Sequence, residues 1–127
     1  MKISTASMPI TAARTPDRIA AVAAEITRAG GKAWAVPCDV TDPASVRALA
    51  DAASRHVKSM DVLINNAGVG HSAPLHKITL EDWNHVLAVN VTGTFLCTQA
   101  FVPGMLERKP IRGSIVNVAS VAGLVGA

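Results

Sequence analysis

The sequence predicts an α/β fold, with a parallel sheet covered by helices on both faces and built as one domain. The chain has 127 residues, which is enough for one domain and too few for two. Half of the residues are apolar and 17% are charged, a composition typical of a globular protein. Apolar segments of strand length alternate with segments of helical periodicity, and this order is typical of right-handed βαβ units.

The first half of the chain contains two predicted strands and two predicted helices. Residues 10–13 are consistent with the end of a strand, and residues 32–36 alternate as a second strand. Each helix begins with an N-cap residue followed by proline, Thr15-Pro16 in one case and Asp42-Pro43 in the other. The predicted apolar stripes are Ile19, Val22, Ala23 and Ile26, then Val46, Leu49, Ala50 and Ala53.

The second half repeats the alternation with a longer helix. A short apolar strand over residues 61–64 runs into the polar turn Asn65-Asn66-Ala67-Gly68. A polar loop over 69–78 follows, and Thr79 then begins a helix predicted to extend from 80 to 108. The last predicted strand covers residues 114–118.

Polar residues follow three of the predicted strands. Asp39, the amides Asn65-Asn66 and Ser120 each come directly after or just beyond a strand. Open parallel sheets bind ligands outside the carboxyl ends of their strands. Ordinary turns also use asparagine, aspartate and serine, so each residue alone has a purely structural explanation. The coincidence of three strand ends favours a nucleotide-type crevice.

The long predicted helix places Asn90 on its apolar face. Its predicted neighbours on that face are Trp83, Val86, Leu87, Thr94, Cys97 and Phe101. A buried amide without partners costs about 1–3 kcal/mol, so Asn90 must bond to something. It either bonds to backbone or serves a site, and the pattern alone favours the first interpretation.

Composition argues against several other functions. The net charge is +3, and the densest basic run, residues 108–112, has no interleaved aromatic residues, so we expect no nucleic-acid binding. Cys38 and Cys97 lack metal-ligand spacing, the histidines form no cluster, and we expect no metal. We expect no membrane span and no signal peptide, and therefore a cytoplasmic protein.

Four motifs occur together in a familiar order and spacing. They are Asp39-Val40, Asn65-Asn66-Ala67-Gly68, Asn90-Val91-Thr92-Gly93 and Gly113-Ser114-Ile115-Val116-Asn117-Val118-Ala119-Ser120. Over residues 10–127 the chain resembles the middle of a short-chain dehydrogenase/reductase. The resemblance implies a Rossmann-like, doubly wound parallel sheet that lacks its central first strand. It also implies NAD(P)-dependent hydride transfer between nicotinamide and a small ketone or secondary alcohol.

The resemblance also implies roles for the cofactor-binding residues. Asp39 would hold the adenine amino group, with Val40 offering backbone contact. Asn66, Ala67 and Gly68 would line the adenosine ribose. Arg14, which follows the neutral Ala13, favours the 2′-phosphate of NADP over NAD, although a solvated arginine at a helix start is the alternative.

The catalytic roles implied by the resemblance fall on Asn90 and Ser120. Asn90 would help to hold a water in a proton relay, and Ser120 would bond to the substrate oxygen. His71 and Ser72 are weaker candidates for lining a substrate pocket. The family's catalytic tyrosine and lysine would follow Ser120, but the chain ends at Ala127 and contains no tyrosine.

The amino-terminal part of the family pattern is also missing, because no glycine precedes Gly30 to form the phosphate-binding turn. We therefore expect a truncated chain that is inactive alone. A second hypothesis is a non-catalytic remnant that forms oligomers through the 80–108 helix, by Val86, Leu96, Phe101 and Met105. A third is a fragment with no independent role.

Overall fold

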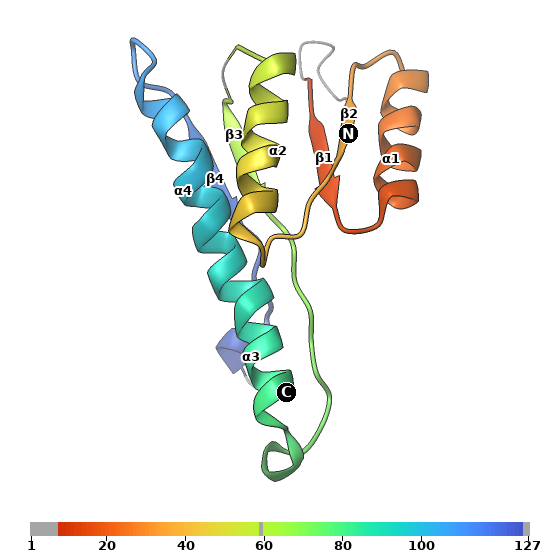
Figure 1. Ribbon diagram of the computed structural model, residues 1–127, viewed down its shortest axis with the longest axis vertical. Helices are drawn as coiled ribbons and strands as arrows, with labels where there is room; N and C mark the ends of the chain where they lie inside the picture. Colours follow the sequence, from red (N-terminus) through yellow and green to blue (C-terminus); the bar gives the residue numbers. More distant parts are fainter. Residues whose placement is uncertain (1–7, 59, 126–127) are drawn as a thin grey trace. The chain divides into compact units, whose positions relative to one another are not determined.

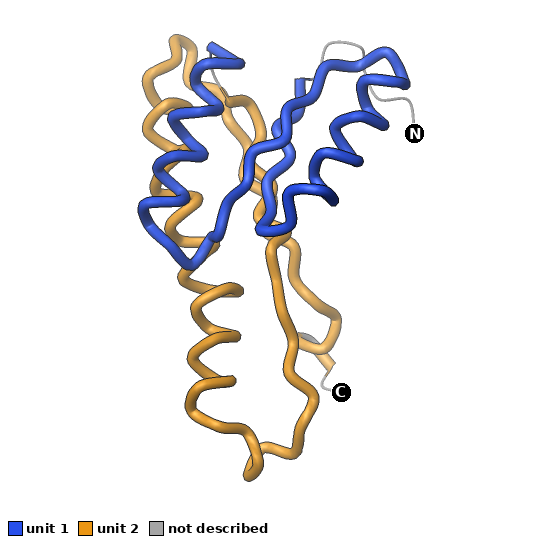
Figure 2. Tube along the Cα trace, turned by 45° about the vertical axis from the view of Figure 1, so that its right-hand side comes forward, with its two compact units in different colours: residues 1–59 blue, residues 60–127 orange. Residues whose placement is uncertain are grey.

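A computed structural model of the protein describes residues 8–58 and 60–125, and the chain forms two compact units, residues 1–59 and 60–127 (Figure 2). Each unit combines parallel strands with helices, which confirms the predicted α/β class. The single-domain organisation stays a prediction. The helices and strands, labelled in Figure 1, are β1 (Ile10–Ala13), α1 (Pro16–Arg28), β2 (Trp34–Pro37), α2 (Pro43–His56), β3 (Val62–Asn65), η1 (Leu75–Lys77), α3 (Leu80–Leu87), η2 (Ala88–Thr92), α4 (Gly93–Leu106), β4 (Ser114–Asn117) and α5 (Ala122–Val125).

In the first unit, α1 packs against the parallel pair β1–β2, whose register runs from Ile10↔Trp34 to Ala13↔Pro37. The second strand lies two residues later at its start than the predicted 32–36. A tight turn ends α1 just before this strand. In it, Gly30 adopts a φ of 88° and Gly31 N–H donates to the Ile26 carbonyl at 3.0 Å. Pairing then begins at Trp34, whose N–H reaches the Pro9 carbonyl at 3.2 Å.

The two helices of this unit begin at the predicted positions, but only one has a side-chain N-cap. Asp42 caps α2, since its carboxylate accepts hydrogen bonds from the N–H groups of Ala44 at 2.9 Å and Ser45 at 3.2 Å. Thr15 occupies the N-cap position of α1, but its side chain makes no capping hydrogen bond. The predicted stripes are confirmed in the main, with Val22 as the clear exception. The buried members are Ile19, Ala23, Val46, Leu49 and Ala53, while Val22 is exposed.

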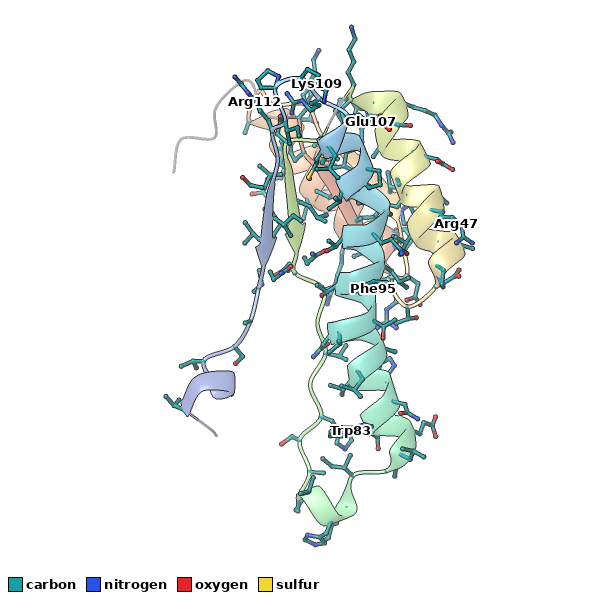
Figure 3. The ribbon with its side chains drawn as sticks, turned by 90° about the vertical axis from the view of Figure 1, so that its left-hand side faces the viewer. Arg47, Trp83, Phe95, Glu107, Lys109 and Arg112 are labelled. Atoms are coloured by element: carbon teal, nitrogen blue, oxygen red, sulfur yellow. The ribbon has the colours of Figure 1, made fainter. Side chains whose placement is uncertain are left out.

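In the second unit, α4 packs against β3, which pairs in parallel with β4 (Figure 3). The register runs from Val62↔Ser114 to Asn65↔Asn117. The strand pairs β1–β2 and β3–β4 form separate two-stranded sheets, and no strand within residues 8–58 and 60–125 joins them. Each unit therefore contains a short parallel sheet with helices, and the α/β fold is incomplete in this chain.

The long helix is interrupted by a π-helical turn. Residues Leu80–Leu106 are helical throughout, but the turn η2 separates α3 from α4 and contains Asn90. By length and composition this helix is long and apolar enough to cross a membrane, so the expectation that no stretch reaches that length is wrong for it. A core helix of a soluble protein can pass the same test, so the observation is weak evidence for a membrane.

Candidate functional site

In the first unit, the candidate residues lie at the carboxyl ends of two paired strands. Arg14 follows β1 directly and is exposed, while Asp39 and Val40 follow β2 and are half-buried. Cys38 N–H donates to the Ala13 carbonyl at 3.1 Å, so the pairing continues to the ends of both strands. The parallel register therefore puts Arg14 and Asp39 at the same edge of the β1–β2 sheet.

A tight turn orients the Asp39 carboxylate. Its Oδ1 atom accepts hydrogen bonds from Thr41 N–H at 2.9 Å and from the Thr41 hydroxyl at 2.8 Å. Its own N–H donates to the Ser45 hydroxyl at 3.0 Å. Asp39 thus caps the turn, which is the structural role that the sequence left open for it. The same contacts hold the carboxylate at the strand end, where a donor on a ligand can meet it.

The Cys38 thiol next to this turn is buried. Burial raises the pKa of the Cys38 thiol, a hydrogen bond with Ser45 opposes that shift, and the nearby charges of Asp39 and Asp42 raise it further. The raised pKa disfavours the thiolate form of Cys38, which is the reactive form of a cysteine. Cys97 is also buried.

In the second unit, a buried amide joins the ends of both strands to the helix. The side-chain nitrogen of Asn65 donates to Asn117 Oδ1 at 2.9 Å and to Thr98 Oγ1 at 3.2 Å. Asn65 is 9% exposed, and it is the final residue of β3, opposite Asn117 at the end of β4. Sequence reasoning assigned Asn65 to a ligand-facing turn and missed this network. Both apolar strands end in asparagine, but only the register between the strands brings the two amides together.

Asn90 holds the loop that follows β3. Its Oδ1 atom accepts from Val69 N–H at 2.9 Å, and its Nδ2 donates to the Val69 carbonyl at 2.9 Å. The prediction that Asn90 lies in a buried stripe is wrong, because the side chain is exposed. The π turn shifts the helical faces, and the buried positions are Val89, Gly93 and Cys97. The alternative that the amide bonds to backbone is confirmed.

This contact brings Asn90 next to the Asn66-Ala67-Gly68 turn, whose three residues are exposed. A Cβ atom built on Gly68 would lie 3.7 Å from Asn90 Oδ1, an ordinary contact distance. The turn therefore lies against the amide without strictly requiring glycine at position 68. Because both ends of the Asn90 amide bond to Val69, its side chain acts on the loop and positions it.

Ser120 lies beyond β4 and is exposed. Its Oγ atom accepts a hydrogen bond from Ala122 N–H at 3.2 Å, at the start of the short helix α5. A serine hydroxyl has one donor and two acceptor sites, so this contact leaves its proton for a ligand oxygen. No hydrogen bond within the described part of the chain joins the Ser120 side chain to Asn90.

The loop histidine considered as a pocket residue lies near an acidic helix start instead. His71 Nδ1 is 3.7 Å from Asp82 Oδ1, and both side chains are exposed by more than a third. A hydrogen bond from Thr79 is the main cause that lowers the pKa of the Asp82 carboxyl, and His71 adds to it. Over residues 8–58 and 60–125, no group of three or more histidine, cysteine or acidic side chains could hold a metal.

The residues present suit part of a nicotinamide dinucleotide and not all of it. In the first unit, an oriented carboxylate at Asp39 and a cation at Arg14 offer an acceptor and a charge that an adenosine with a 2′-phosphate needs. In the second unit, residues 67 and 68 are small and exposed. The chain has no glycine before Gly30, so it contains no amino-terminal glycine-rich cradle for the pyrophosphate.

Known proteins with similar sequences are dehydrogenases and reductases. One, from Xanthobacter autotrophicus, is named "Inactive 2-(S)-hydroxypropyl-CoM dehydrogenase 2" and is 49% identical over 82% of this chain and 43% of its own length. Another, D-threitol dehydrogenase from Mycolicibacterium smegmatis, is 44% identical over 83% of this chain and 40% of its own length. The chain thus spans less than half the length of these relatives.

Solved structures agree with the sequence relatives. A metagenomic short-chain oxidoreductase in complex with NADP superposes with a TM-score of 0.81 at 36% identity, covering 90% of this chain and 51% of its own. A short-chain type dehydrogenase/reductase from Mycobacterium marinum superposes with a TM-score of 0.85 at 35% identity, covering 91% of this chain and 46% of its own. The family model described as "short chain dehydrogenase" matches residues 4–127. The chain therefore belongs to the short-chain dehydrogenase/reductase family of oxidoreductases.

Proposed function

We propose that this chain is part of an NAD(P)-dependent oxidoreductase that moves hydride between nicotinamide and a ketone or secondary alcohol. The observation that carries the proposal is the pair of 2.9 Å hydrogen bonds between Asn90 and the backbone of Val69. These bonds fix the loop with the exposed Asn66-Ala67-Gly68 turn at the carboxyl end of β3, where open parallel sheets bind ligands. The bound cofactor would supply or accept the hydride.

The chain's own residues would bind and orient. Ser120 donates its hydroxyl proton to the carbonyl or alcohol oxygen of a small substrate, and Asn90 acts as a positioning residue that also supports a proton-relay water. Asp39 accepts a hydrogen bond from the adenine amino group, with Val40 beside it. Asn66, Ala67 and Gly68 line the adenosine ribose.

Arg14 supports NADP as the preferred dinucleotide. Arg14 is exposed directly after β1. The residue before it is the neutral Ala13, so this position offers no acid to bind the free ribose 2′-hydroxyl of NAD. Two similar proteins of known structure contain NADP, the metagenomic oxidoreductase and a gluconate 5-dehydrogenase from Burkholderia cenocepacia. The arginine–phosphate contact predicts that Arg14→Ala weakens NADPH binding about tenfold and leaves NADH binding unchanged.

Titration calorimetry with both dinucleotides measures this preference. Arg18→Ala is the matched control, because Arg18 is an exposed arginine in the first turns of α1. Equal loss in both variants, or equal loss for NADH and NADPH, would count against the assignment of Arg14.

Residues 1–127 alone should have no turnover, because they contain no tyrosine to act as the acid/base group of the family. A positioned general acid/base contributes about 10²–10⁴-fold to a rate. Purified chain incubated with NADPH and a panel of ketones should consume no more NADPH than a Ser120→Ala control. Steady NADPH loss above that control refutes the proposal that residues 1–127 alone are inactive.

A second candidate function is non-catalytic association with another copy through the long helix. Four apolar residues recur every four positions along it and are exposed by 50, 39, 60 and 58%: Trp83, Leu87, Val91 and Phe95, of which Figure 3 labels the first and last. This stripe differs from the predicted set of Val86, Leu96, Phe101 and Met105, of which Met105 is buried and the other three are half-buried. Met105 is only 4% exposed and lies against Gly113, so it is not available to a partner.

Size measurement by light scattering separates these candidates. A homo-oligomer that Phe95→Lys converts to monomer, and that Phe101→Lys does not, supports association through the exposed stripe. A strict monomer that binds nicotinamide dinucleotide counts against it. We assign the protein to the cytoplasm, because its two cysteines are buried and have no spacing typical of a disulfide framework, which suits a reducing compartment.

A further inference from the structure

The helix that contains Asn90 is irregular at that residue. In the π-helical turn η2, Gly93 N–H donates to the Ala88 carbonyl, five residues back, whereas an α-helix uses the carbonyl four residues back. Such turns are rare and occur mostly as single turns within α-helices. Side-chain hydrogen bonds to this turn are therefore candidates for the contacts that keep Asn90 in place.

Thr94 makes such a contact with the main chain of Asn90. Its Oγ1 atom donates to the Asn90 carbonyl at 3.0 Å, and Thr94 lies in the first turn of α4, four residues after Asn90. A threonine hydroxyl bonded to the carbonyl four residues back slightly destabilises a helix and often bends it. The contact therefore does not serve the stability of α4, and it acts on the residue whose side chain holds the loop after β3.

Asn90 is thus bonded through its main chain and through its side chain. The carbonyl accepts from Thr94, while the side-chain amide makes its two 2.9 Å hydrogen bonds with Val69. All three residues belong to the unit 60–127. Hydrogen bonds weaken as their angles depart from linear, so a small shift of the Asn90 main chain would weaken both bonds to Val69 together.

We propose that Thr94 is a positioning residue that acts through Asn90. Its hydroxyl holds the main chain of the π turn, and this keeps the Asn90 amide aligned with Val69 and with the Asn66-Ala67-Gly68 turn. The consequence for cofactor binding rests on the proposed function, which assigns that turn to the adenosine ribose. The alignment of Asn90 by Thr94 does not depend on that function.

Three variants of the full 127-residue chain isolate the hydroxyl of Thr94. Thr94→Val removes the hydroxyl and keeps the branched shape of the side chain, while Thr94→Ser keeps the hydroxyl. Thr92→Val is the matched control, because it makes the same change in the same turn at a side chain without a capping hydrogen bond. If circular dichroism shows that Thr94→Val is unfolded, Thr94→Ala takes its place. Amide hydrogen exchange followed by NMR is the measurement.

Exchange of the Val69 amide should be about threefold faster in Thr94→Val than in the parent chain, and unchanged in Thr94→Ser and Thr92→Val. The reference is the Trp83 amide, which bonds to the Thr79 carbonyl at 3.0 Å at the start of α3 and should keep its rate in every variant. The proposal is overturned by a parent rate at Val69 in Thr94→Val, or by Thr94→Ser exchanging as fast as Thr94→Val. An equal rise at Trp83 also overturns it, because Thr94 would then stabilise the helix in general.

Titration with NADPH separates this inference from the proposed function. If the parent chain binds NADPH, Thr94→Val should weaken that binding about threefold and Thr94→Ser should restore it. Unchanged affinity together with faster exchange at Val69 overturns the role of Thr94 at the site. A parent chain that does not bind NADPH contradicts the proposed function, and the exchange rates at Val69 then still support or overturn the positioning of Asn90 by Thr94.

Discussion

The two units of the molecule use their polar side chains in different ways. In the first unit the carboxylates bond to their near neighbours, as Asp42 does to Ala44 and Asp39 to Thr41, both two residues along the chain. In the second unit, amides bond across 52 residues from Asn65 to Asn117 and across 21 residues from Asn90 to Val69. The carboxylates of the first unit thus form local turns and caps, while the amides of the second unit join elements that are far apart in sequence.

The comparison predicts where substitutions are most damaging. Removing a local cap affects one helix end, whereas removing a long-range amide weakens the junction between elements that are far apart in sequence. Loss of one side-chain amide in the second unit should therefore lower the free energy of unfolding more than loss of one carboxylate in the first unit.

The largest effect is expected for Asn65→Ala. The change leaves Asn117 and Thr98 without their shared donor at the junction of β3, β4 and α4. We expect the free energy of unfolding to fall by about 2 kcal/mol, measured by urea denaturation. Asn66→Ala is the control, since Asn66 is exposed, and should change stability by no more than about 0.5 kcal/mol. Equal effects in both variants would remove the distinction between the two units.

A smaller and more local effect is expected for Asn90→Ala. Two hydrogen bonds to the Val69 backbone are lost, which should destabilise the loop by about 1–2 kcal/mol. The sensitive measurement is hydrogen exchange of the Val69 amide, which should become faster. Asn84→Ala, an exposed asparagine in α3, should leave that exchange rate unchanged. Slow exchange at Val69 in Asn90→Ala would show that other contacts hold the loop.

The first unit contains a matched pair that tests its dependence on caps. Asp42→Ala removes a carboxylate bonded to two backbone N–H groups at the start of α2 and should cost about 1 kcal/mol. Thr15→Ala changes the equivalent position of α1, where the side chain makes no capping bond, and should have almost no effect. Urea denaturation of both variants measures the difference. A larger loss for Thr15→Ala would contradict the assigned cap chemistry.

The same contrast explains how far the sequence predicts the structure. Helix starts at Pro16 and Pro43 and the polar residues at the strand ends follow from neighbouring residues, and they lie where predicted. The register that pairs Asn65 with Asn117 depends on two strands far apart in sequence, so no local pattern indicates it. The π turn at Ala88–Thr92 contains no helix-breaking residue, and without it Asn90 is predicted on the wrong face.

The smallest effect is expected at Asp82, where the second unit contains a local cap of the type that shapes the first. The Thr79 hydrogen bond lowers the pKa of the Asp82 carboxyl in the folded chain, and His71 lowers it further. A carboxyl with a lowered pKa stabilises the fold fully above its ordinary value of about 4 and loses that contribution as the pH falls through the lowered value. Asp82→Asn should therefore reduce the difference in stability between about pH 6 and about pH 2.

Urea midpoints at both pH values measure this difference. The effect should be small, because the Asp82 side chain is 38% exposed and solvent screens its charge. Glu81→Gln is the matched control, an acid on the same turn that takes no part in the Thr79 pair, and it should leave the contribution of that pair in place. If the two variants change the pH dependence equally, the stabilisation comes from acidic charge at the helix start in general. If only Asp82→Asn changes it, the cap geometry is responsible, and the second unit contains local as well as long-range polar contacts.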